Sequence, residues 1–176
     1  MTKRKLYGDA KLIEEKLNAM QLVEEAAGGL AAVYKDASAD KSSFWMKYYA
    51  SATTPGGGFL MLLKLPLPTT EELISLAIHS PFEDEAVAAI LRLLDEEAIE
   101  KKDFRHLLLE NLEQLHLASP SEQQKQRLRK VITLAALDDP MNRREVLHKS
   151  KLQVQEDAAY FESVAQRAKL LLGRLQ

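Results

Sequence analysis

The sequence predicts an all-α fold, a stack of antiparallel helix hairpins, with a closed helical bundle as the alternative. The first observation is a set of three capping-box patterns, in which a hydroxyl residue precedes a glutamate by three positions: Thr69 with Glu72, Ser80 with Glu83, and Ser119 with Glu122. The second is a proline directly after Ser80, Ser119 and Asp139, at the first helical position, which tolerates its missing N–H. These closely spaced starts predict short helices packed side by side.

Length and composition describe one domain over residues 1–176. Of the 176 residues, 46% are hydrophobic and 28% charged, values close to those of a globular domain. A net charge of −2 and the absence of cysteine favour neither a nucleic-acid partner nor thiol chemistry, and they fit a reducing compartment. No apolar leader follows the basic residues 3–5, and no apolar run approaches membrane-spanning length. We therefore expect a cytoplasmic protein without a membrane segment.

The first third of the chain is expected to be helical. Apolar residues recur at helical spacing over 9–27, where Gly28-Gly29 ends the helix, and residues 30–34 add a further turn. The aromatic run 44–50 opens another helix, capped by Ser42 or Ser43.

Residues 53–58, Thr-Thr-Pro-Gly-Gly-Gly, are the strongest break in the chain. They form a candidate hinge between the helical N-terminal segment and a hairpin stack at 69–176. The apolar run 59–65 that follows fits a buried helix or a strand. Its leucines, with no β-branched residue, favour the helix.

Five helices are expected in the hairpin stack, near 70–79, 81–95, 100–117, 120–137 and 140–173. The last carries apolar residues at strict seven-residue spacing, with a break near Ser150 as an alternative: Leu147, Val154, Phe161, Ala168 and Leu175. This heptad seam over 147–175 could pack inside the chain or hold a homo-oligomer together.

Two helix ends share the pattern Ile-Ser/Thr-Leu-Ala followed by a polar cap and a proline, over 74–81 and 132–140. At these turns the chain resembles HEAT-like or armadillo-like α-solenoid repeats, over 71–94 and 127–150, about half of its length. The resemblance implies a scaffold whose concave face binds a protein or a nucleic acid.

Charge is segregated along the chain: residues 83–103 carry a net charge of −5 and residues 120–151 a net charge of +4. One interpretation is two solvated helix faces that attract each other. The other is a partner-binding basic patch, formed by Arg127, Lys130, Arg143 and Arg144. The aromatic run adds two candidate contacts, Trp45 and Tyr49, which lie four residues apart and belong either to the core or to an exposed anchor.

No residue pattern predicts a catalytic site, a cofactor or a metal site. The four histidines lack metal-ligand spacing, the glycine run lacks a phosphate-loop lysine, and the acidic runs fit helix ends. We therefore expect a non-enzymatic protein: a protein–protein interaction scaffold, or an inhibitor of the bacterial immunity type. The alternative is a nucleic-acid-associated helical protein that uses the basic segment 120–151.

Overall fold

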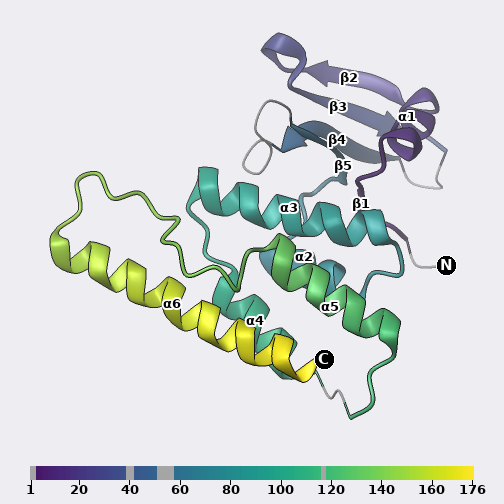
Figure 1. Cartoon of the computed structure of the whole chain (residues 1–176). Helices are drawn as coiled ribbons and strands as arrows, with labels where there is room; N and C mark the ends of the chain where they lie inside the picture. The colour runs from purple at the N-terminus through teal and green to yellow at the C-terminus, as the bar shows by residue number, and fades with distance from the viewer. Residues whose placement is uncertain (1–2, 39–41, 51–57, 116–117) are drawn as a thin grey trace. The chain divides into compact units, whose positions relative to one another are not determined.

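The structure, a computed structural model, describes residues 3–38, 42–50, 58–115 and 118–176. The described chain divides into two compact units, unit 1 (Met1–Glu100) and unit 2 (Lys101–Gln176) (Figure 1). Except for Gly58, the expected hinge at 53–58 lies outside the described residues. The fold is mixed α/β, so the all-α prediction and the resemblance to helical repeats are both wrong.

Unit 1 is built on an antiparallel sheet that, in the described ranges, has five strands in the order β1-β5-β4-β3-β2. The strands are β1 (Leu6–Tyr7), β2 (Gln21–Glu25), β3 (Ala31–Asp36), β4 (Ser43–Ala50) and β5 (Phe59–Lys64). Strands β2 to β5 form a meander, in which each strand pairs with the next along the chain. Strand β1 joins the far edge by pairing with β5, Leu6 opposite Leu63.

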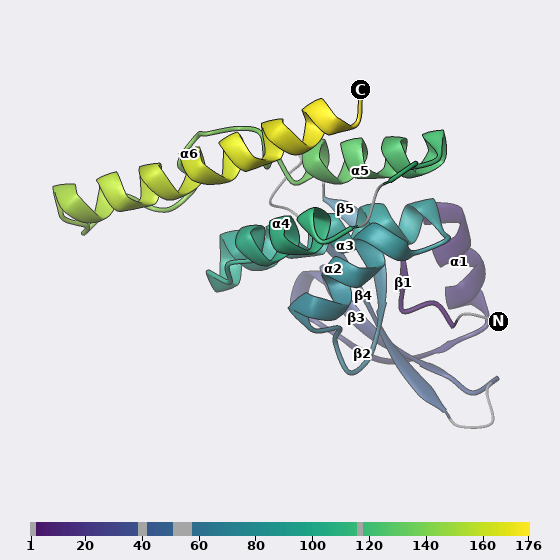
Figure 2. The ribbon, with the colours of Figure 1, turned by 90° about the horizontal axis from the view of Figure 1, so that it is seen from below.

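Helices cover both faces of this sheet (Figure 2). On one face Ile13 of α1 (Ala10–Asn18) packs in a buried cluster with Tyr7, Trp45 and Leu62. Successive strand residues point to opposite faces, so Leu6, next to Tyr7, points the other way. That second face meets α3 (Glu83–Glu100), which is preceded by α2 (Thr70–His79).

The segments 44–50 and 59–65 are strands β4 and β5, not the helices that we expected. Trp45 and Tyr49 are four residues apart, a spacing that is also even, so it fits one face of a strand as well as one face of a helix. Aromatic side chains moreover favour strands. In β5, Met61, Leu62 and Leu63 are all buried, because the strand is covered on both faces.

The expected helix over 9–27 is also wrong beyond Asn18, where α1 ends. Gln21–Glu25 is strand β2, and residues 31–36 form its partner β3 rather than a further helical turn. Gly28 and Gly29, in a short 3₁₀ turn (Ala27–Gly29), have φ values of +84° and +69° and connect the two strands. These glycines therefore end a strand and not a helix.

Unit 2 contains helices α4 (Arg105–Glu113), α5 (Glu122–Leu134) and α6 (Lys151–Arg174). Capping boxes begin α5 at Ser121 and α6 at Ser150, instead of the expected starts at Ser119 and Asp139. No helix is present in residues 135–150, all of which are described. The second solenoid-like turn is therefore not followed by a helix, which is a further reason why the repeat pattern fails.

Helix α6 is buried in unit 2 only from Phe161 onward. Phe161, Val164, Ala165, Ala168 and Leu171 are buried, whereas no residue of 151–160 is, and α6 contacts α4. The first turns of α6 extend past α4 in both views of the ribbon (Figures 1 and 2). Leu147, the first residue of the expected seam, lies outside the helix and is 67% exposed. Of the described helices, none combines the length and the apolar character needed to cross a bilayer.

Replacing Gly8 by alanine should destabilise unit 1. A Cβ at Gly8 would lie 2.7 Å from the main-chain oxygen of Asp84 and 3.1 Å from Cβ of Ala88. Overpacking of this kind costs about 1–3 kcal/mol. The expected result is a lower urea midpoint in Trp45 fluorescence, which reports unit 1 because Trp45 is the single tryptophan of the chain.

Gly173→Ala is the matched control, because a Cβ at Gly173 in α6 meets nothing within 4 Å. It should leave the Trp45 transition unchanged and stabilise the helix by roughly 0.5–1 kcal/mol, followed by circular dichroism. If Gly8→Ala leaves the Trp45 midpoint unchanged, the close approach of β1 to α3 is wrong.

Candidate functional site

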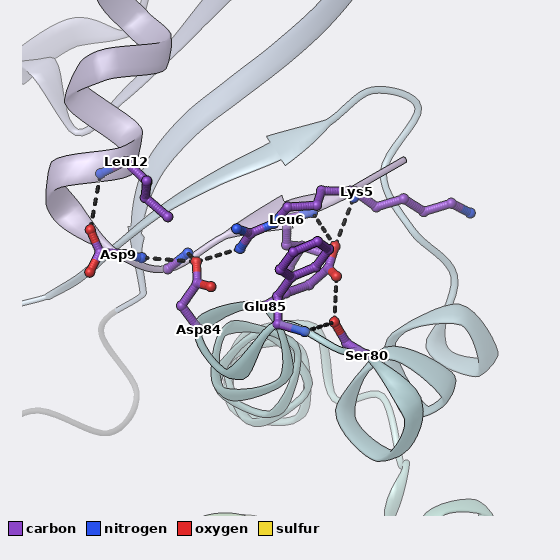
Figure 3. Close-up of polar contacts among 10 residues, drawn as sticks. Lys5, Leu6, Asp9, Leu12, Ser80, Asp84 and Glu85 are labelled. Carbon is purple, nitrogen blue, oxygen red and sulfur yellow. Dashed lines mark hydrogen bonds and ion pairs between the residues drawn. The ribbon is translucent and has the colours of Figure 1, made fainter. Parts of the chain in front are cut away.

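Two adjacent acids in the first turn of α3 hold the main chain of β1 and of the residues on either side of it (Figure 3). Oε1 of Glu85 accepts hydrogen bonds from the main-chain N–H of Lys5 at 2.8 Å and of Leu6 at 3.1 Å. Oε2 of Glu85 accepts from the Ser80 hydroxyl at 2.6 Å. Glu85 is 2% exposed, so both carboxylate oxygens are buried among donors. We call Asp84 and Glu85, with the donors they bind, the carboxylate clasp.

Asp84 binds the next residues of the chain in the same way. Its Oδ2 accepts from the main-chain N–H of Gly8 at 3.1 Å and of Asp9 at 3.3 Å, and from Arg4 Nη2 at 2.5 Å. The Arg4 guanidinium in turn lies 4.1 Å from the ring centroid of Tyr7. Burial alone would raise the pKa of Asp84, but the Gly8 N–H and Arg4 outweigh it and hold the pKa below its usual value.

The clasp is a structural device. Its carboxylates already accept hydrogen bonds from fixed main-chain and side-chain donors, and the described contacts contain no nucleophile–base pair. From the sequence these acids were assigned only to the helix dipole. Their main-chain partners lie 75 to 80 residues away along the chain, so no local pattern could have identified those contacts.

The two aromatic candidates have different environments. Trp45 is 6% exposed and packs against Tyr7, with ring centroids 5.7 Å apart, so it belongs to the core. Tyr49 is 40% exposed and has Lys47 Nζ 6.0 Å from its ring centroid. Of the two, Tyr49 is the one that remains accessible to a partner.

The four basic candidates are divided between α5 and the segment that follows it. On α5, Arg127 is half-buried and Lys130 is exposed, and both interact with other residues. In the following segment, Arg143 pairs with Asp139 at 2.8 Å. Arg144 pairs with two acids, described next. The structure therefore gives at least Arg143 and Arg144 acidic partners within the chain.

Arg144 and Lys149 fasten the non-helical segment before α6. Both donate to the carboxylate of Asp157 in α6, at 2.7 and 2.5 Å. These two hydrogen bonds, first that of Lys149 and then that of Arg144, lower the pKa of Asp157. Arg144 also lies 3.5 Å from Asp103 and 4.3 Å from the ring centroid of Tyr160. We call these contacts the ion-pair brace.

Tyr160 contacts two residues of the ion-pair brace, Arg144 and Asp103. Its hydroxyl donates to Oδ1 of Asp103 at 2.5 Å, and its ring packs against His106 at a tilt of 44°, with centroids 4.7 Å apart. Burial, followed by the hydrogen bond to the Asp103 carboxylate, raises the pKa of Tyr160. Tyr160 is therefore protonated at neutral pH and serves as a hydrogen-bond donor.

The braced segment carries exposed apolar side chains. Between residues 141 and 152 four of them are more than half exposed: Met141 at 61%, Val146 at 54%, Leu147 at 67% and Leu152 at 64%. The N–H of Lys149 donates to the Val146 carbonyl at 3.3 Å, closing a turn with Leu147 at its tip. His148, in that turn, has a φ of +63°. We call residues 141–152 the projecting segment.

Among the described residues, no group of three or more histidine, aspartate or glutamate side chains is placed to hold a metal ion. Comparisons with protein-family models, with curated proteins and with solved structures each found no match.

Sequence reasoning did not identify the exposed apolar residues of the projecting segment as a surface cluster. It assigned Leu147 to the heptad seam and gave the others no role. A cluster of apolar residues without a helical partner is the signal that could have identified them.

The carboxylate clasp should make unit 1 sensitive to acid. The folded-state pKa of Asp84 is depressed, so folded protein binds fewer protons than unfolded protein just below the ordinary aspartate pKa of about 3.9. The stabilisation is therefore present at neutral pH and is lost as pH falls through the folded pKa. The urea midpoint of Trp45 fluorescence should fall less steeply between about pH 6 and pH 3 in Asp84→Asn than in the wild type.

Asp84→Asn should also be less stable than the wild type at the upper end of that range. Glu14→Gln, an exposed position on α1, is the control and should keep the wild-type slope. Equal slopes in wild type and Asp84→Asn would show that the Asp84 carboxylate is not what holds β1.

Proposed function

We propose that the chain is a non-enzymatic protein-binding module and that the projecting segment is its contact surface. The observation that carries this proposal is the exposure of Met141, Val146, Leu147 and Leu152 on a segment that ion pairs hold in place. Apolar groups that gather on a surface mark interaction sites. The partner that fits is a protein with an apolar groove that receives the Val146-Leu147 turn.

The conformation of the turn supports the same proposal. A non-glycine residue in the left-handed region, such as His148, stores strain of about 1–3 kcal/mol. The ion-pair brace holds this strained turn with Leu147 at its tip. Because the ion pairs already hold the turn before binding, its backbone loses less conformational freedom on association than that of a flexible loop would.

The specific form that we propose is an inhibitor of the bacterial immunity type, in which the turn occludes a groove on a target protein. A nucleic acid has less support. A phosphate would have to compete with Asp157 and Asp139 for Arg144 and Arg143. The cytoplasmic location and a homo-oligomer remain predictions, the latter now centred on the exposed half of α6.

Replacing Val146 and Leu147 by serine should abolish partner capture. Burial of one leucine contributes about 1.5–3 kcal/mol, so the double variant should bind more than tenfold more weakly. The measurement is native affinity capture with the full chain as bait, followed by titration of the purified partner. Binding should change little with salt, whereas nucleic-acid binding would weaken steeply.

Leu170→Ser is the matched control, since Leu170 is also 67% exposed on unit 2 but lies outside the projecting segment. The Leu170→Ser variant should capture the partner as well as the wild type does. Asp157→Asn tests the ion-pair brace. It should weaken partner binding because Asp157 holds Arg144 and Lys149 in place, and not because Asp157 contacts the partner. Equal capture by wild type and the Val146/Leu147 variant, or no stoichiometric protein with any bait, would contradict the proposal.

A further inference from the structure

The three helices of unit 2 line a pocket of about 170 Å³. Leu112 comes from α4, Leu128 and Ile132 from α5, and Leu171 from α6, with Leu175 just beyond its end. The mouth is formed by Glu113, Leu115 and Arg174. We call this the three-helix pocket. It shares no residue with the projecting segment.

The wall of the pocket consists of core side chains. Each of its five aliphatic residues is at most 7% exposed: Leu112, Leu128, Ile132, Leu171 and Leu175. An engineered cavity of about 150 Å³ lined by similar residues stays dry and binds benzene. The volume here therefore suits an apolar group of roughly six carbons.

The mouth is charged, and its two charges are not equivalent. Glu113 is bound in a bidentate manner by Arg167, at 2.9 Å and 2.7 Å, and this contact is the main cause of the lowered pKa of Glu113. Arg174 makes no hydrogen bond within the described part of the chain, and its charge also helps to lower the pKa of Glu113, whose two carboxylate oxygens both bind Arg167. Its guanidinium is therefore placed to bind a second carboxylate at the rim.

We propose that the three-helix pocket binds a small amphipathic monocarboxylate, with an alkyl or aryl part of roughly six carbons in the pocket and its carboxylate on Arg174. Two properties determine this class. The apolar wall excludes a ligand that is polar throughout, and the Arg174 guanidinium, which donates no hydrogen bond to a described residue, selects an anionic head over a cationic one.

Hexanoate is the test ligand, with hexylamine as a probe of equal chain length and opposite charge. Binding to the full chain is followed by the methyl NMR signals of the pocket leucines and Ile132. Hexanoate should shift these signals saturably. Hexylamine should bind at least about tenfold more weakly, since a charge-assisted hydrogen bond is replaced by repulsion from Arg174.

Two variants test separately what the apolar wall and the charged mouth contribute to binding. Arg174→Gln, at an exposed position, should weaken hexanoate binding about tenfold, while Lys169→Gln, also at an exposed position on α6, should leave it unchanged. Ile132→Phe should fill the pocket and remove binding. If that variant does not fold, the charge comparison still decides the question.

Three results would overturn the proposal. They are the absence of saturable shifts at millimolar hexanoate, equal affinity for hexanoate and hexylamine, and unchanged affinity in Arg174→Gln. None of these outcomes bears on the projecting segment, so this proposal and the proposed function can fail separately.

Discussion

Strand β1 contains two residues, and the carboxylate clasp supplies the hydrogen bonds that so short an edge strand lacks. The placement of α1 on the sheet depends on this contact. Helix α1 begins three residues after β1 ends, so the position of β1 fixes the position of Ile13 over Tyr7, Trp45 and Leu62. Glu85 is buried with its donors in place, and the loss of either side would leave unpaired polar groups in the interior.

Unit 2 uses acids in a similar way. Asp157 fastens a segment without helical structure by accepting from Arg144 and Lys149, as Asp84 and Glu85 fasten β1. Asp84 and Glu85 of the acidic run, and Arg144 and Lys149 of the basic run, are therefore used to hold backbone segments inside each unit. This leaves apolar side chains, rather than the arginines, as the groups best placed for recognition.

The sequence was most informative where the determinants of structure are local. The helix expected at 70–79 is α2, and its capping box at Thr69 is present, because a cap involves residues three apart. The strands were missed because their stability comes from pairing with distant segments. The four-residue spacing of Trp45 and Tyr49 fits the period of a helix as well as that of a strand. The residues of β2 were interpreted as the continuation of α1.

For the candidate site, the sequence located Arg143 and Arg144 in the relevant segment but could not show that acids pair with them. Nor could it show that Leu147 lies outside α6 at the tip of a turn, since its seven-residue spacing to Val154 fits a continuous helix. The most direct test of the account is hydrogen exchange on the full chain at the amides of Lys5, Leu6 and Gly8. The clasp predicts protection comparable to that of the central strand β4, lost at Lys5 and Leu6 in Glu85→Gln and at Gly8 in Asp84→Asn. Free exchange of these three amides while β4 stays protected would contradict it.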